Sequence, residues 1–555
     1  MMMTIHPFGF LPLALLSAWT LHAHAVSASA AAESHSVGGQ RAEAETTAAT
    51  AATPEVPAAG SVYYIQEYRV QGSKTIPPLA VEEAVYPYLG RGRTEADVEK
   101  ARAALEKAYH QAGYQAVSVE IPPQDVAEGV VFLRVNENPV GRLRVRGTRY
   151  FTPSAIKAHA PELAEGKLLD FTGVNKAVMR LNRLRDLRVA PELKPGAQPG
   201  TLDIDLKVQD SLPLHGSIEL NNRYSPDTVK LRLNGSISYE NLWQAGHAAG
   251  FNFQVAPEKP SDATVYSAYY LARFREVDWL TLLLQGTKQN SDVSTLGGVA
   301  VAGRGSVLGF RLMASLPGSE KLFHTLSAGV DWKNFDEDVL IGGRRSSTPI
   351  EYFPLTVNYA AVRTGKSGTT ELNAGLNFGF RGAGSDVREF DAKRYNATGA
   401  YIYLRGDLSR TQEMPKGMQL YARVQGQLSP DNLINSEQFS AGGLGTVRGY
   451  LESTAVGDNA VLGTLELRSP SLIKPGAAKG NEWRLHAFVE GGRLSLNDAL
   501  PEQQDVMELM SAGIGTRLKV AEHYNGTLDL GFPLKSLNGT ERGDWQLSFR
   551  VWGEF

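Results

Sequence analysis

Residues 419–428 read QLYARVQGQL, and every second position in this segment is small or apolar. The even-numbered positions carry Leu, Ala, Val, Gly and Leu, whereas the odd-numbered positions carry Gln, Tyr, Arg, Gln and Gln. Successive side chains of a β-strand point to opposite faces, so this pattern predicts a strand with one apolar and one polar face. A single strand of this kind also fits a half-buried sheet of a soluble protein, so its meaning depends on how often the pattern recurs.

The pattern recurs from residue 214 to the C-terminus. Residues 400–408 and 483–490 alternate in the same way, and Gly, Asn, Asp and Pro separate such blocks. The 342 residues from 214 to 555 provide about 21 residues for each strand and connection, which suits transmembrane strands of about ten residues. We therefore predict that residues 211–555 form an all-β transmembrane barrel of about 16 antiparallel strands, closed because no strand edge can stay unpaired in hydrocarbon. The sixteen candidate strands begin near residues 214, 228, 247, 264, 278, 303, 322, 350, 368, 396, 416, 457, 482, 510, 524 and 544.

A different pattern precedes the barrel. Residues 62–137 are expected to contain a strand, two helices and two further strands, and residues 138–210 repeat that order. The helical signal is clear at Val98, Ala101 and Leu105, which recur at helical spacing. The fold class is therefore α+β for two tandem domains, followed by the all-β barrel. The expected elements are 62–70, 78–88, 94–112, 116–121 and 129–135 in the first copy, and 140–145, 153–160, 171–184, 187–193 and 202–208 in the second.

The N-terminal segment has the layout of an export signal followed by a linker. Residues 8–21 form a short apolar run, and two Ala-x-Ala sites follow it, which predicts a signal peptide at residues 1–25. The segment before the apolar run has no Lys or Arg, so a buried N-terminal helix is the alternative. Residues 26–61 are expected to be a polar linker, with a plug helix near residues 39–50 as a second option. No run of 18 apolar residues follows the signal peptide, so the barrel pattern indicates an outer-membrane protein.

The composition of the chain excludes several kinds of chemistry. With 56 Lys and Arg against 59 Asp and Glu, the net charge of −3 leaves no basic field for nucleic acid. The chain has no cysteine, so it has neither disulfides nor thiolate metal ligands. The 11 histidines show no metal-ligand spacing, and no candidate nucleophile has a base at a suitable spacing. We therefore expect no enzyme activity, no cofactor and no metal.

A glycine-rich connection lies between two of the expected strands. Residues 436–450 read SEQFSAGGLGTVRGY and fall in a connection at about 429–456. Connections of this length are usually functional or disordered. Counting strands from a periplasmic N-terminus puts this connection on the outer side of the membrane. Its candidate functional residues are Gly442, Gly443, Val447, Arg448, Gly449 and Tyr450.

The tandem domains resemble a known family. Residues 108–114 (AYHQAGY), which run into residues 117–122 (VSVEIP) and 129–131 (GVV), resemble POTRA domains. The similarity is to the pair of POTRA domains in two-partner secretion transporters of the haemolysin secretion/activation family, and it covers residues 62–210. Because units of this element order are common, an ordinary periplasmic adaptor domain is the alternative.

The glycine-rich connection carries a second resemblance. Residues 447–450 (VRGY) match the VRGY/F signature of the superfamily that includes barrel insertases and two-partner secretion transporters. In that superfamily the loop folds inward, and its arginine meets an F-x-D-x-G motif on the barrel wall. The corresponding residues here are Phe488, Glu490 and Gly492, with Glu in place of the family's Asp. Glu466 and Arg468 could extend this network, although a solvated lumen wall explains them equally well.

The resemblance implies an outer-membrane translocator that captures a partner exoprotein in the periplasm and exports it through its barrel, in two-partner (type V) secretion. The expected partners are the exoprotein client, the barrel-assembly machinery during biogenesis and outer-membrane lipid, with a monomeric barrel and no nucleic acid. One alternative is an insertase for other barrels, which usually has more tandem domains. The other is a passive or uptake channel, a class that lacks domains like those of residues 62–210.

The last expected strand alternates up to the C-terminal residue, Phe555. In the barrel families that this chain resembles, a terminal Phe on such a strand is recognised by the outer-membrane insertion machinery. The alternative is that the fold simply ends in a strand. Deleting Phe555 is therefore expected to lower the amount of assembled barrel, measured as the heat-modifiable band on semi-native gels. An unchanged band would show that the residue is not an assembly signal.

Overall fold

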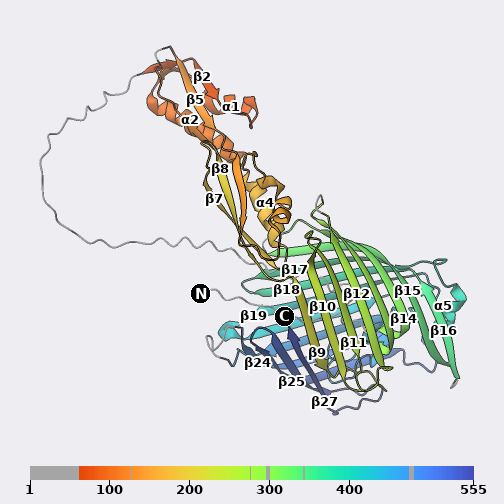
Figure 1. The fold of residues 1–555 in the computed structure, drawn as a ribbon. Coiled ribbons are helices and arrows are strands. Elements are labelled where there is room, and N and C mark those ends of the chain that lie inside the picture. The colour runs from red at the N-terminus through yellow and green to blue at the C-terminus, as the bar shows by residue number, and fades with distance from the viewer. Residues whose placement is uncertain are drawn as a thin grey trace, which may run out of the picture. The chain divides into compact units, whose positions relative to one another are not determined.

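The computed structural model describes residues 62–126, 128–274, 277–294, 301–319, 321–341, 344–473 and 480–555. The signal peptide expected at residues 1–25 and the linker or plug helix expected at residues 26–61 lie outside these ranges. The chain divides between Leu212 and Pro213 into two compact units, which are described separately (Figure 1).

The first half of the N-terminal unit is a small sheet packed on helices. Its elements are β1 (Tyr63–Ile65), β2 (Glu67–Gln71), α1 (Pro78–Val85), the 3-10 helix η1 (Tyr86–Tyr88), β3 (Gly90–Arg93), α2 (Glu95–Gln111), β4 (Ser118–Glu120) and β5 (Val130–Asn136). β5 lies between β2, which is parallel to it, and β4, which is antiparallel. α2 and the sheet bury Leu105, Tyr109 and Leu133 completely. β3, which pairs with β1, is absent from the expected scheme because its sequence GRGR has no apolar residue.

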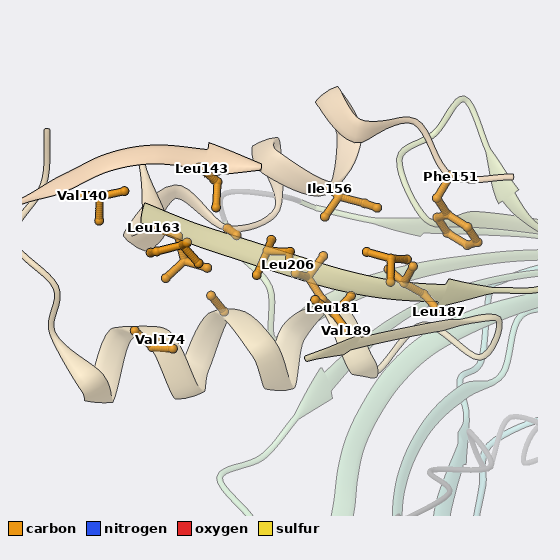
Figure 2. Packing of buried hydrophobic residues seen from close by; sticks show 14 of the residues in the cluster. Val140, Leu143, Phe151, Ile156, Leu163, Val174, Leu181, Leu187, Val189 and Leu206 are labelled. Atoms are coloured by element: carbon orange, nitrogen blue, oxygen red, sulfur yellow. The ribbon is translucent and has the colours of Figure 1, made fainter. Parts of the chain in front are cut away.

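The second half repeats this arrangement around its own core. Its elements are β6 (Val140–Arg146), α3 (Pro153–Ala158), η2 (Pro161–Leu163), α4 (Phe171–Asn182), β7 (Leu187–Pro195) and β8 (Leu202–Asp210). β8 lies between parallel β6 and antiparallel β7. Figure 2 shows Val174 and Leu181 of α4 facing Leu206 of β8. The second half therefore has the predicted order of one strand, two helices and two strands, and the first half has the same order with β1 and β3 added to it.

Asp210, the last residue of β8, organises the turn that follows β6. Its carboxylate accepts hydrogen bonds from the backbone N–H groups of Arg149, Tyr150 and Phe151, at 2.9, 2.7 and 2.9 Å. Burial raises the pKa of the Asp210 carboxyl, but the three N–H donors act in the opposite direction and together hold the pKa below its usual value. The charged form of Asp210 is thus the one that the fold prefers.

The C-terminal unit is a closed antiparallel barrel (Figure 1). The strands before the central connection are β9 (Leu214–Asn221), β10 (Arg232–Leu242), β11 (His247–Val255), β12 (Ala263–Arg273), β13 (Leu280–Ser294), β14 (Val301–Ser315), β15 (Leu322–Ile341), β16 (Arg344–Tyr352), β17 (Leu355–Gly365), β18 (Gly368–Gly379), β19 (Tyr401–Glu413) and β20 (Gln419–Leu428). The strands after it are β23 (Asn459–Arg468), β24 (Glu482–Ser495), β25 (Val506–Val520), β26 (Tyr524–Pro533) and β27 (Gln546–Glu554). The barrel closes where β27 pairs with β9.

Two of these segments form one interrupted strand. β16 pairs with residues 333–341 of β15, and β17 pairs with residues 322–330 of the same strand. Pro354 lies in the gap between β16 and β17, where proline cannot donate to a ladder, and its carbonyl accepts a hydrogen bond from the Asp331 N–H at 3.1 Å. The 17 segments therefore amount to sixteen barrel strands, which confirms the expected number.

Several expected strand starts are wrong by a few residues. β10 begins at Arg232 instead of residue 228, and β19 begins at Tyr401 instead of residue 396. In both places the chain still turns, because Asp227 has a φ of 63° and Asn396 a φ of 64°. The connection before β19 also contains a short helix, α5 (Val387–Lys393), which strand alternation could not reveal.

The two faces of the barrel strands differ as the alternation predicts. On β20, Val424 is 56% exposed and Leu428 is 64% exposed, whereas Arg423, Gln425 and Gln427 are buried. The apolar face therefore points outward to lipid, and the polar face points into the barrel. In the described part of the chain, no helix is both long enough and apolar enough to cross a membrane.

The Asp210 contacts predict a pH-dependent stability. Asp210→Asn keeps the shape of the side chain but removes its charge, so the free energy of unfolding at pH 7 is expected to fall by about 1–3 kcal/mol. Urea unfolding of residues 62–212, followed by circular dichroism, measures this difference. Because the folded-state pKa lies below the unfolded value of about 3.9, the wild-type advantage is complete above that pH and disappears as the pH falls through the folded-state pKa. A difference that stays constant with pH would contradict the role of the charge.

Candidate functional site

The connection between β20 and β23 spans residues 429–458 and folds into the barrel. Its two arms form a short hairpin, in which β21 (Phe439–Ala441) pairs with β22 (Ala455–Gly457). At the start of the tip, Gly442 has a φ of 112° and Gly443 a φ of 85°, a conformation that side chains disfavour. The tip residues Val447, Arg448 and Tyr450 are 0%, 5% and 2% exposed. Because their contacts are with inward-facing residues of the wall, the tip occupies the lumen.

Arg448 and Glu490 are brought together by the fold. Nη2 and Nε of Arg448 lie 2.6 and 3.0 Å from Oε1 of Glu490. The backbone N–H of Arg448 donates to Oε2 of the same carboxylate at 2.7 Å. Glu490 is on the inner face of β24 and is 5% exposed. Glu therefore reaches the arginine although the family pattern has the shorter Asp at this position.

Two more carboxylates complete the surroundings of Arg448. Its Nη2 lies 2.8 Å from Oε2 of Glu466 on β23, and its Nη1 lies 2.8 Å from Oδ1 of Asp529 on β26. Three barrel strands thus each supply one acidic group to the same guanidinium. Sequence reasoning included Glu466 but missed Asp529, which lies between the outward-facing Leu528 and Leu530. Strand parity could have placed Asp529 on the inner face, but no motif singled it out.

Further cations balance the acidic groups. Arg468 and Arg517 lie 2.7 and 2.8 Å from Oε1 of Glu466, so that this carboxylate contacts three arginines. His486 Nε2 lies 2.7 Å from Oδ1 of Asp529. The cluster of three carboxylates and three arginines is therefore neutral apart from any charge on the imidazole. Such balance is required, because an unpaired buried charge is strongly destabilising.

Aromatic and glycine residues shape the space around the arginine. The guanidinium carbon of Arg448 lies 3.5 Å from the centre of the Phe488 ring, a cation–π contact on the inner face of β24. A Cβ on Gly513 of the neighbouring strand β25 would lie 2.3 Å from Phe488 Cζ, so a residue with a side chain does not fit at this position. Gly492 does not contact the loop but allows β24 to lie close to β23, since a Cβ on Gly492 would lie 2.4 Å from the carbonyl oxygen of Val461 on β23.

Gly449 and Tyr450 hold the tip against the last strands of the barrel. Gly449 has a φ of 98°, and a Cβ on Gly531 of β26 would lie only 2.7 Å from its nitrogen. The Tyr450 hydroxyl donates to the carbonyl of Lys535 at 2.7 Å and accepts from the N–H of Met510 at 3.3 Å. Only glycines permit this close approach of two backbones.

The first arm of the loop has its own attachment, which the sequence did not predict. Glu437 is 1% exposed, and Lys333 Nζ lies 2.5 Å from its carboxylate. The hydroxyls of Tyr352 and Tyr403 donate to the same carboxylate at 2.6 and 2.8 Å. Arg423, on the inner face of β20, donates to the carbonyl of Gly445 at 2.9 Å. The loop is thus attached to both sides of the wall.

Phe555 takes part in barrel closure. Its N–H donates to the carbonyl of Gly216 at 3.0 Å, and the Gly216 N–H donates back to its carbonyl at 3.2 Å. Its side chain is 65% exposed on the outer surface. Within the described ranges there is no group of three or more acidic or histidine residues arranged to hold a metal ion.

Known proteins with similar sequences are bacterial outer-membrane transporters. The family model of the haemolysin secretion/activation protein ShlB/FhaC/HecB matches residues 200–518, and that of the ShlB-type POTRA domain matches residues 63–138. The outer membrane transporter CdiB of Escherichia coli is 24% identical over 486 residues, which cover 86% of this chain and 79% of CdiB. The heme/hemopexin transporter protein HuxB of Haemophilus influenzae is 19% identical, over 83% of this chain and 82% of HuxB.

Solved structures share the fold. CdiB from Escherichia coli superposes with a TM-score of 0.62 at 21% identity, over 91% of this chain and 93% of that one. BamA from Haemophilus ducreyi, without its POTRA domains 1–3, gives a TM-score of 0.55 at 15% identity, over 89% and 100% of the two chains. The family model covers more than half of this chain. The protein therefore belongs to the haemolysin secretion/activation family ShlB/FhaC/HecB, as an outer-membrane translocator of two-partner secretion with its POTRA domains in the periplasm.

Proposed function

We propose that the loop of residues 429–458 closes the barrel, and that an exoprotein client displaces it on its way out. The observation that carries this proposal is the position of Arg448 among the carboxylates of Glu466, Glu490 and Asp529, which we call the seat of the loop. Charge-assisted hydrogen bonds stabilise the buried guanidinium among its three acidic partners, and water also solvates each of these charged groups well. The loop can therefore leave its seat without unfolding the wall, provided that client and water replace its contacts.

The POTRA domains provide the surface for client capture in this proposal. Among the residues that the structure describes, β7 pairs with β8 alone and β4 with β5 alone, so that one side of each strand is an edge of its sheet. An extended client can add a strand to such an edge through backbone hydrogen bonds, and side-chain pockets then give specificity. Strand addition suits a client that reaches the membrane unfolded.

Assembly and energetics complete the proposal. The barrel-assembly machinery inserts the protein after binding the strand that ends at Phe555, and the barrel then works as a monomer because β27 and β9 close it. No step is enzymatic. Folding of the client outside the cell supplies the driving force, since the sequence has no nucleotide-binding motif.

Replacing Arg448 tests the seat directly. Arg448→Ala leaves three buried carboxylates without their shared partner, and the seated state should lose about 3–5 kcal/mol. We expect normal levels of heat-modifiable barrel but reduced export, measured as exoprotein in the culture medium, because a loop without its fixed position no longer keeps the lumen in the single arrangement that the client enters. Arg448→Lys, which keeps the charge without the forked geometry, should export an intermediate amount. Arg493→Ala, an exposed arginine on the same strand as Glu490, is the matched control. Wild-type export by Arg448→Ala would contradict the role of the loop.

Deleting the tandem domains tests client capture. Removal of residues 62–210 should abolish export while the remaining barrel still assembles. Pulse-labelled exoprotein is then expected to accumulate in the periplasm and to be degraded there. Export at the normal rate by the truncated protein would refute capture by these domains.

A further inference from the structure

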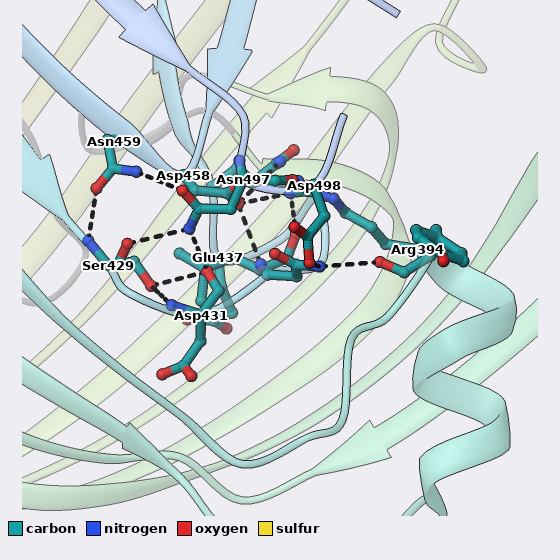
Figure 3. Close-up of polar contacts among 12 residues, drawn as sticks. Arg394, Ser429, Asp431, Glu437, Asp458, Asn459, Asn497 and Asp498 are labelled. Carbon is teal, nitrogen blue, oxygen red and sulfur yellow. Dashed lines mark hydrogen bonds and ion pairs between the residues drawn. The ribbon is translucent and has the colours of Figure 1, made fainter. Parts of the chain in front are cut away.

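A further buried carboxylate, Asp458, lies where the inward loop returns to the barrel wall. Asp458 is the last residue of the connection, directly before β23, and is 0% exposed. Its carboxylate accepts backbone N–H groups of Leu433 at 3.0 Å and Asn497 at 2.8 Å, and the side-chain amide of Gln438 at 3.2 Å. Figure 3 shows Asp458 beside Asn497.

The remaining partner of Asp458 is an arginine from another connection. Arg394 follows α5 in the connection between β18 and β19, and its Nη1 and Nη2 lie 2.5 and 2.7 Å from the two oxygens of Asp458. The same guanidinium donates to the carbonyls of Leu433 and Asn497, both at 2.8 Å. Arg394 thus contacts residues 429–458 and residues 496–505 at once, and its side chain is 11% exposed.

Asparagine side chains join the same three connections. Asn396 and Asn432 donate to the carboxylate of Asp498 at 2.9 and 3.1 Å. Asn497 donates to the carbonyls of Ser429 and Asp431 at 3.0 and 2.9 Å (Figure 3). The three connections follow β18, β20 and β24, which are alternate strands and therefore run in the same direction. Because β9 leaves the periplasmic side and neighbouring strands alternate in direction, these three strands run outward and their connections lie at the outer end of the barrel.

We infer that Asp458 and Arg394 form a latch that holds the outer connections together and positions the inward loop for export. This inference rests on the proposed function. Asp458 is at the hinge where the loop leaves the wall, whereas Arg448 is at the tip, so the two charges hold different ends of one segment. The loop cannot swing out of the lumen while the forked contact between Arg394 and Asp458 persists.

The burial of both charges favours two states of the latch, closed and fully open. In the closed state, the Asp458 carboxylate has five hydrogen bonds from three connections, and the Arg394 guanidinium has four. In the open state, water at the cell surface can hydrate both charges. A partly open state would leave a charge buried without its partner, which is unfavourable. Opening of the three connections is therefore expected to be cooperative.

Ion conductance of the full-length protein in planar bilayers, with KCl as the probe, tests the latch. Arg394→Gln and Asp458→Asn each remove hydrogen bonds to a buried charge, so we expect the open probability to rise by about tenfold or more. Arg394→Lys keeps the charge but not the forked contact and should give a smaller rise. Arg388→Gln, an exposed arginine on α5, is the matched control and should conduct like the wild type.

The outcomes separate the latch from a general role in folding. The graded order of the glutamine, lysine and wild-type proteins at position 394, with normal heat-modifiable barrel, supports the latch. Wild-type open probability in both Arg394→Gln and Asp458→Asn overturns it. Loss of assembled barrel in all three latch variants also overturns it, because the residues would then be structural only. If the wild-type barrel conducts ions but exports no exoprotein, the proposed function is contradicted. The conductance of the variants still tests the latch in that case.

Discussion

A charge inside a closed barrel has to be neutralised where it lies, and the centre of this structure follows from that requirement. Arg448 is held by one acidic residue from each of three strands, Glu466, Glu490 and Asp529. Three carboxylates at one level repel one another, and Arg468 and Arg517 offset that repulsion through Glu466. Neither the loop nor the wall is therefore complete alone, and each stabilises the charged groups of the other.

Close packing sets the second condition for this arrangement. The loop backbone at Gly449 approaches the strand backbone at Gly531 so nearly that a Cβ on Gly531 would overlap it. The rings of Phe488 and His486 lie over Gly513 and Gly515, where any side chain would collide with them. The glycines of β25 and β26 thus provide room for an arginine seat in a lumen that other side chains would fill.

The loop is attached at its tip and at both arms, through groups of different kinds. The tip depends on Arg448, the first arm on Glu437 with Lys333, and the second arm on Asp458 with Arg394. Each attachment is polar and therefore exchangeable with water or with a passing peptide, unlike an apolar core. A segment held by polar contacts of this kind is well fixed at rest and can still be released as a unit, as the proposed role of the loop in closing the barrel requires.

The sequence by itself determined which face of each barrel strand is polar, how many strands there are, and that Arg448 and Glu490 belong to one motif. The polar face and the strand number depend on a period of two residues, which can be read along a single strand. The pairing of Arg448 with Glu490 depends on the resemblance of both segments to the motifs of a known superfamily. The sequence did not determine that Asp529 and Arg517 join Arg448, that α5 precedes β19, or that Arg394 meets Asp458 from 64 positions away. Alternation indicates the face on which a side chain lies but not its height relative to the neighbouring strands. That height is set by the register of the hydrogen-bonded ladders and by the paths of the long connections, and only the tertiary structure decides both.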